Sequence, residues 1–237
     1  MYSYPQIHDF GNYPYNTTAY DDRMQVEQRY RAKRNLNGLI ELIDRLFDYH
    51  SRLFVVRIDI GYIQEVCQSI SIEHVQRHFK QLIGDRRSYP DIFNGLVGYA
   101  WGLEYGANGG GYHYHMLLLY DGSMRRNYFM IDQSTREVWN RITGGFGRCY
   151  CSNFDEDKFV NEGHLGIGMI HRDDVRRRIN LIEKVAPYIT KKSSDFGIES
   201  GAAGVGLFRT FGKSQTPPLI NPDVPRPGRK PVLNRSR

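Results

Sequence analysis

Two apolar segments on either side of a glycine-rich turn are the feature that most constrains the fold of this chain. Residues 95–105 (GLVGYAWGLEY) and 112–120 (YHYHMLLLY) are each typical of a β-strand, and residues 106–111 (GANGGG) are the strongest turn signal in the sequence. Together they predict a β-hairpin. Residues that lie directly opposite each other in such a hairpin share one face of the sheet, so this segment also predicts which side chains meet.

The remaining elements predict an α+β domain with a central, mainly antiparallel sheet flanked by helices. We expect helices from Asp21–Asp22 to about His50, from Ser71 to Gly84, over 135–142, and over 173–192 with a break at Pro187. We expect further strands over 52–60 and 208–211, and a glycine-rich closing segment over 144–150. This order of elements favours helices on one face of the sheet.

Composition divides the chain into an N-terminal arm (residues 1–22), a folded domain (23–214) and a tail (215–237). Six of the ten prolines follow Gln215, and residues 222–237 hold five Arg or Lys and one Asp. Such a composition predicts a disordered, basic tail. Two interpretations of the tail stay open: it adds non-specific affinity for phosphates, or it is an inert extension.

The charge of the chain favours an acidic partner, and nucleic acid comes first among these. The formal net charge is +6 and the pI is about 9.2, although a basic protein without such a partner would show the same values. Three cysteines do not make a disulfide framework, and a single C-x-C at 149–151 is a weak basis for a zinc site. With no signal peptide and no apolar run of ~20 residues, we expect a cytoplasmic protein without a membrane partner.

A metal site is predicted on the hairpin. His113 and His115 are two residues apart on one strand, so their imidazoles point to the same face, and Glu104 lies across the turn from them. Two His and one carboxylate suit Mg²⁺, Mn²⁺ or a transition metal, whereas an H-x-H alone is more often structural. Ala100 and Gly102 are expected to leave open space beside the metal. Leu117 argues against a histidine-triad hydrolase, and residues 117–120 lack the carboxylate of a cupin site.

Tyr188 is the first candidate among seventeen tyrosines for a nucleophile. It lies in V-A-P-Y-I-T-K-K, where Lys191 is three residues on and shares its helix face, with Lys192 as a second cation. A phenol has a pKa of ~10 and needs a nearby cation or metal to attack. The same lysines would also be ordinary residues at a helix C-terminus.

Three segments, taken in order, resemble motifs I, II and III of the HUH endonucleases. They are F-V-V-R-I-D-I at 54–60, G-Y-H-Y-H-M-L-L-L at 111–119 and P-Y-I-T-K-K at 187–192. L-F-R-T-F-G-K-S at 207–214 is similar to a segment that follows the tyrosine helix in the same proteins. The likeness spans residues 52–214 and is closest to the single-tyrosine replication initiators of filamentous phages (inoviruses) and related prophages.

The resemblance implies a fold of the HUH, ferredoxin-like or RRM-like kind, and a nickase that starts rolling-circle replication with Mg²⁺ or Mn²⁺. Glu104, His113 and His115 would bind the metal, Tyr188 would attack the scissile phosphate and Lys191 would assist. The products would be a 5′-phosphotyrosine and a free 3′-OH, and the reverse reaction would rejoin ends. Some relatives carry Y-x-x-x-Y, but Lys184 occupies the earlier position here, which leaves the second cleavage of a round unexplained.

The implied partners are single-stranded or supercoiled DNA at a replication origin, in the cytoplasm of a bacterium that carries the gene on a phage, prophage or plasmid. No G-x-x-x-x-G-K-[ST] loop occurs, so a host helicase and polymerase are expected to act with it. Two alternatives stay open: an HUH transposase or relaxase, and a non-catalytic protein that binds an origin.

Several further side chains have both a functional and a structural interpretation. Asp59 either orients a metal-bound His or is a polar residue at the sheet surface. Trp101, Tyr112 and Tyr114 face away from the histidines and are expected in the core. Candidate phosphate contacts, which would otherwise be surface charges, are Arg176, Arg177, Lys192, Arg209 and Lys213.

Overall fold

The computed structural model describes residues 17–106, 110–190 and 209–220, with the side chains of part of the first helix left out. The helical elements are α1 (Thr17–Tyr49), α2 (Ile72–Gly84), η1 (Arg86–Ser88), α3 (Pro90–Phe93), α4 (Tyr128–Ile142), η3 (Ser152–Asp155), α5 (Glu156–Asn161), α6 (Val175–Asn180), η4 (Leu181–Val185) and α7 (Ala186–Thr190). The strands are β1 (Arg52–Tyr62), β2 (Leu96–Gly106), β3 (Gly111–Asp121), β4 (Gly147–Cys151), β5 (Gly168–His171) and β6 (Phe211–Lys213).

The described strands form one antiparallel sheet, which confirms the predicted α+β class. Their order is β4-β1-β3-β2-β6, and β5 pairs with the first part of β1 beside β4. The β2–β3 hairpin forms where it was predicted, and β1 lies against its β3 strand. The two strands that carry the predicted motif I and motif II residues are therefore direct neighbours.

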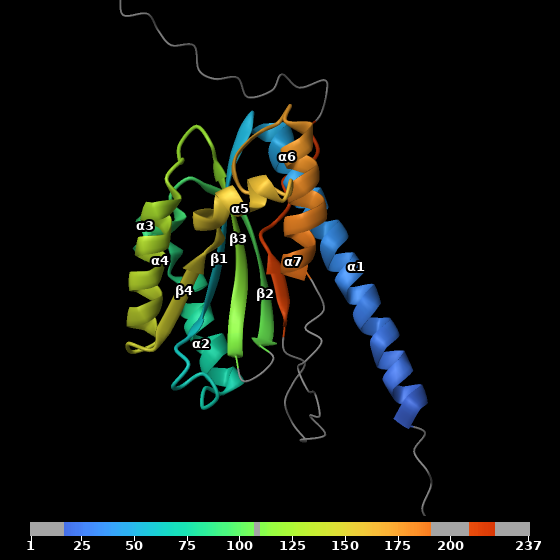
Figure 1. Ribbon diagram of the computed structural model, residues 1–237, viewed down its shortest axis with the longest axis vertical. Coiled ribbons are helices and arrows are strands. Elements are labelled where there is room, and N and C mark those ends of the chain that lie inside the picture. Colours follow the sequence, from blue (N-terminus) through green and yellow to red (C-terminus); the bar gives the residue numbers. More distant parts are fainter. Residues whose placement is uncertain (1–16, 107–109, 191–208, 221–237) are drawn as a thin grey trace, which may run out of the picture.

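Helices cover both faces of the sheet, so the expectation of helices on one face was wrong (Figure 1). On one face, α2, α3 and α4 pack on a core that contains Ile58, Tyr114 and Trp139. On the other, α1, η4 and α7 pack on a core that contains Val55 and Leu117. Both faces of β1 are apolar over residues 53–56, and a strand of this kind needs cover on both sides to bury its side chains.

Helix α1 begins at Thr17, about one turn before the predicted capping residues Asp21–Asp22. Residues 17–22 are thus helical, and residues 1–16 of the predicted arm lie outside the described residues.

The tyrosine-bearing helix does not break at Pro187. The turn before it, Leu181–Val185, is π-helical, and Pro187 lies in the first turn of α7. Proline lacks an amide hydrogen and its ring crowds the carbonyl one turn back, and widening that turn relieves the contact.

At the C-terminal end, the last strand is Phe211–Lys213 instead of 208–211. Of the predicted tail, residues 215–220 have no regular secondary structure, and the Tyr49 hydroxyl donates to the Pro218 carbonyl at 3.1 Å. Residues 221–237 lie outside the described part. Among the described helices, none is long and apolar enough to span a membrane.

Candidate active site

The β2–β3 hairpin brings Glu104, His113 and His115 together. Glu104 shares a face with both histidines, as the hairpin pattern predicted, and it lies directly opposite His113, with His115 two residues further along the same face. One ligand atom from each side chain lies within 4.8 Å of the other two. Within the described residues this is the one His/Cys/Asp/Glu group close enough to hold a metal ion.

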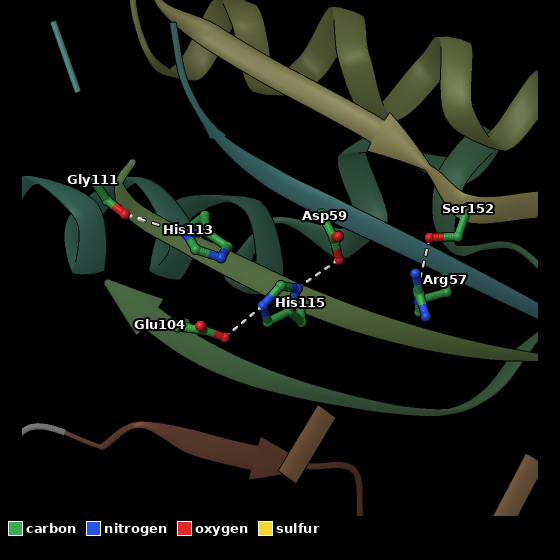
Figure 2. Close-up of polar contacts among 7 residues, drawn as sticks. All are labelled: Arg57, Asp59, Glu104, Gly111, His113, His115 and Ser152. Atoms are coloured by element: carbon green, nitrogen blue, oxygen red, sulfur yellow. Dashed lines mark hydrogen bonds and ion pairs between the residues drawn. The ribbon is translucent and has the colours of Figure 1, made fainter. Parts of the chain in front are cut away.

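His115 is held from both sides by carboxylates (Figure 2). Its Nδ1 is 2.8 Å from Asp59 Oδ1 on β1, and its Nε2 is 2.9 Å from Glu104 Oε2 on β2. The imidazole is 4% exposed, so these partners determine its orientation. His115 Nε2 and the Glu104 carboxylate could both bind a metal ion, and Asp59 would orient the imidazole through Nδ1.

One ring nitrogen of His113 is also hydrogen-bonded within the protein. Its Nδ1 is 3.2 Å from the Gly111 carbonyl oxygen, which can only accept, so Nδ1 carries a proton and Nε2 is left as a ligand atom. Burial lowers the pKa of His113, and the neighbouring His115 lowers it further, against the opposing effect of the Gly111 hydrogen bond. The neutral ring is the form that binds metals.

Tyr188 on α7 lies over this group. Its ring centroid is 4.5 Å from that of His115, and the Arg57 guanidinium carbon is 4.3 Å from the centre of the Tyr188 ring. Burial raises the pKa of Tyr188 to about 12, and Asp59 adds to the rise through its charge, while the Arg57 cation opposes it. The phenol is therefore protonated near neutral pH, and its reactivity depends on groups that remove or replace that proton.

Arg57 is the site residue to which the sequence interpretation assigned no role. It is two residues before Asp59 on β1 and lies opposite Leu117, on the same face as the histidines. Its Nε donates to Ser152 Oγ at 2.7 Å, which holds the guanidinium above the Tyr188 ring. The alternation of Arg57 and Asp59 along a strand was the available signal, because it places both on the face of His115.

The space expected beside the metal at Gly102 is filled. A Cβ at Gly102 would overlap the carbonyl oxygen of Ile189 on α7. Ala100 is fully buried in the core that α1 and α7 cover. The small side chains of β2 thus let the backbone of α7 lie directly on the sheet. This close approach positions Tyr188, the residue before Ile189, above His115.

Gly102→Ala is expected to lower the free energy of unfolding by about 1–3 kcal/mol, because the methyl group would push backbone against backbone. Urea unfolding followed by circular dichroism measures this. Gly84→Ala at the end of α2 is the matched control, since a Cβ there meets nothing within 4 Å. Equal stability of the two variants would contradict the close packing of α7 on β2.

The predicted phosphate contacts from α6 differ in their surroundings. Arg176 is exposed. Arg177 donates to the Met169 carbonyl at 2.7 Å and pairs with Glu156 at 3.3 Å, so its charge is used within the protein. The neighbouring Arg178 pairs with Asp44 of α1 at 3.0 Å.

The C-terminal cations Arg209 and Lys213 lie at β6, the edge strand next to β2. Arg209 donates to the Phe211 carbonyl at 2.8 Å and lies 5.9 Å from the Trp101 ring centre, and Trp101 packs against the core on the opposite face. The Lys213 ammonium donates to the Thr216 hydroxyl at 2.6 Å. Lys191 and Lys192 lie outside the described residues.

Three aromatic residues that were expected to face away from the histidines lie on the opposite face of the sheet. Tyr114 is buried in the core against α2, and Trp101 and Tyr112 pack against it. Cys149 and Cys151 are free thiols buried on that face, and burial raises the pKa of both. Neither thiol belongs to a group of three potential metal ligands within the part of the chain that the structure describes.

The comparison with protein families matches residues 16–146 to the YagK/YfjJ C-terminal domain. That match covers more than half of the chain. The chain belongs to the YagK/YfjJ C-terminal domain family. The matched part contains Asp59, Glu104, His113 and His115, and ends before β4 and Tyr188. The comparisons with curated proteins and with solved structures found no match.

Proposed function

We propose that this chain is a site-specific, single-strand DNA endonuclease and rejoining enzyme that starts rolling-circle replication. The observation that carries the proposal is the contact of the Tyr188 ring with His115, within a Glu–His–His group that could hold a metal ion. A tyrosine nucleophile next to such a group would supply both components of a metal-assisted transfer of a DNA phosphate to the enzyme.

The side chains present fit a divalent metal. Two imidazoles and one carboxylate converge, and Asp59 holds His115 as outer partners of metal-bound histidines do. When bound, Mg²⁺ or Mn²⁺ would act as a Lewis acid that polarises the scissile phosphate. The donor set does not choose between these ions, and Mg²⁺ and Mn²⁺ are proposed from the resemblance to HUH endonucleases.

In the proposed reaction, the Tyr188 oxygen attacks phosphorus as the bond from phosphorus to the 3′ oxygen breaks. The phenol loses its proton to solvent before the attack, and the leaving 3′ oxygen takes up a proton from water. The 5′ end becomes a phosphotyrosine and the 3′-OH becomes the primer. Arg57 stabilises negative charge that develops on the phenol oxygen, and Lys191 remains a candidate for the same task.

Metal-dependent formation of a covalent protein–DNA adduct tests this proposal. The protein is incubated with Mn²⁺ and a labelled single-stranded library, and the adduct is isolated on a denaturing gel and sequenced. Activity that persists in excess EDTA would contradict the metal-dependent reaction. Enrichment of transposon ends or a transfer origin, instead of a replication origin, would favour a transposase or relaxase. DNA binding without any adduct would favour a non-catalytic origin-binding protein.

The rate of adduct formation is expected to rise with pH, by about tenfold per unit at neutral and mildly alkaline pH. The reactive form is the phenolate, and the raised pKa of Tyr188 makes this form scarce at neutral pH. Single-turnover rates measure the profile. Arg57→Gln should move it to higher pH, because the Arg57 charge lowers the Tyr188 pKa. A rate independent of pH would contradict attack by a phenolate.

A further inference from the structure

The face of the sheet that carries the candidate active site continues onto β4. Tyr150 lies opposite Asp59, and Arg148 lies opposite Gly61, in the antiparallel pairing of β1 and β4. Opposed residues share a face, so Tyr150 and Arg148 lie on the same face as His115. Because Gly61 has no side chain, no side chain of β1 lies between Arg148 on β4 and His113 on β3.

Phe146 extends this row by one step. The Ile63 amide donates to the Phe146 carbonyl at 3.0 Å, which continues the register of β1 and β4 past the end of the assigned strand. Residues 146, 148 and 150 therefore alternate with residues that face the buried core, where Cys149 is 4% exposed. We refer to Phe146, Arg148 and Tyr150 as the β4 strip.

The β4 strip is exposed although two of its three side chains are aromatic. Phe146 is 44% and Tyr150 is 42% exposed. Arg148 is exposed and has no acidic partner among the described residues. The Tyr150 hydroxyl donates to the Asp155 carboxylate, which holds the tip of the ring. Packing within the chain thus does not explain why these side chains occur in this order.

The order and spacing of the strip match a single nucleic-acid strand. Side chains two apart on a β-strand are ~7 Å apart, so an aromatic, a cation and an aromatic follow one another along an extended line. Proteins that bind single strands combine aromatic side chains, on which bases stack, with cations that contact the backbone phosphates. An apolar protein partner fits less well, because it would bury Arg148 without an opposite charge.

We propose that the β4 strip binds the single-stranded DNA that leads into the active site. Bases stack on Phe146 and Tyr150, and Arg148 contacts the phosphate between them. This inference rests on the proposed nuclease function, and adds the path of the strand across the sheet. The strand would reach His113 and Tyr188 from the β4 edge, over the position of Gly61.

The test compares two double variants in fluorescence anisotropy with a labelled oligothymidylate in EDTA, where no cleavage occurs. Arg148→Ala/Tyr150→Ala removes the cation and one ring from the strip. Arg126→Ala/Phe129→Ala removes an exposed cation and an exposed ring near the start of α4, which packs on the opposite face. We expect the strip variant to bind about tenfold or more weakly than the wild type, and the control to bind like the wild type.

The salt dependence of binding separates the contribution of the Arg148 charge from that of the aromatic rings. Arg148→Ala alone should reduce the slope of log affinity against log salt by about 0.7, as expected for one lost phosphate contact with a single strand. Phe146→Ala should weaken binding without changing this slope. Equal affinities of the strip variant, the control and the wild type would overturn the proposal, provided that circular dichroism shows all three folded. A strip variant whose oligomeric state changes while its DNA affinity does not would overturn it too, in favour of an interface between copies.

Failure of the nuclease proposal would give a different result. In that case the wild type forms no adduct with Mn²⁺, yet its DNA affinity still depends on the β4 strip. Conversely, the wild type and the strip variant could form the adduct equally well and bind DNA with equal affinity. This result would contradict DNA binding by the β4 strip but not the nuclease proposal.

Discussion

Tyr188→Phe is expected to reduce formation of the covalent protein–DNA adduct by about a thousandfold or more, because it removes the attacking oxygen. The phenylalanine ring keeps the ring contacts with His115 and Arg57, but the variant loses the hydrogen bond between the Tyr188 hydroxyl and Asp59. Binding of single-stranded DNA should stay close to the wild type, and loss of this hydrogen bond should lower the free energy of unfolding by about 0.5–1.5 kcal/mol. The adduct is measured with Mn²⁺ and a labelled oligonucleotide on a denaturing gel.

Tyr105→Phe is the matched control for this variant. Tyr105 is next to Glu104 on β2, but its ring contacts Tyr112 on the other face of the hairpin. It should form the adduct at the wild-type rate. An adduct that survives in Tyr188→Phe would show that another tyrosine is the nucleophile, and peptide mapping of the adduct would identify it.

His115→Gln is expected to weaken binding of Mn²⁺ by more than about a hundredfold, which exceeds the usual effect of changing an outer partner of a metal site. His115 contributes one of the three ligand atoms, and its imidazole lies between the carboxylates of Asp59 and Glu104. Asp59→Asn should cost about 10–100-fold, because it leaves the ligand in place but removes the charge that orients it. Isothermal titration calorimetry measures both affinities.

Glu137→Gln on α4 is the control for loss of one negative charge, since Glu137 is exposed and remote from the ligands. It should bind Mn²⁺ like the wild type. A ligand that binds only the folded state stabilises it, so Mn²⁺ should raise the unfolding temperature of the wild type and of Glu137→Gln but not of His115→Gln. Equal Mn²⁺ affinity in all of these proteins would show that the metal binds elsewhere.

Much of the candidate site follows from local sequence patterns. The alternation of His113 and His115, together with the length of the glycine-rich turn, was sufficient to place Glu104 across the hairpin from the two histidines, and the structure pairs it with His113. Such a prediction succeeds because hairpin register depends on residues that are close in the chain. The pairing of β1 with β3 brings Asp59 to His115, and this required the tertiary structure, because the two residues are 56 positions apart.

The parts of the fold that were missed had weak or contradictory local signals. Strands β4 and β5 span five and four residues, and β4 begins with glycine, so neither shows a long alternation. The uninterrupted apolar run of residues 53–56 did indicate that helices cover both faces of the sheet, because such a run is typical of strands buried on both sides.

The sequence by itself determined the hairpin, the face that carries the histidines and the acidic residue opposite them, because strand alternation and turn chemistry are local. It also ranked Tyr188 first among the tyrosines, through its neighbours in the chain. Only the tertiary structure decided that Tyr188 contacts His115, that Arg57 lies over its ring, and that Phe146, Arg148 and Tyr150 continue the same face. These contacts depend on strand order and on the close approach of α7 to Gly102, and such long-range packing leaves no periodic pattern in the chain.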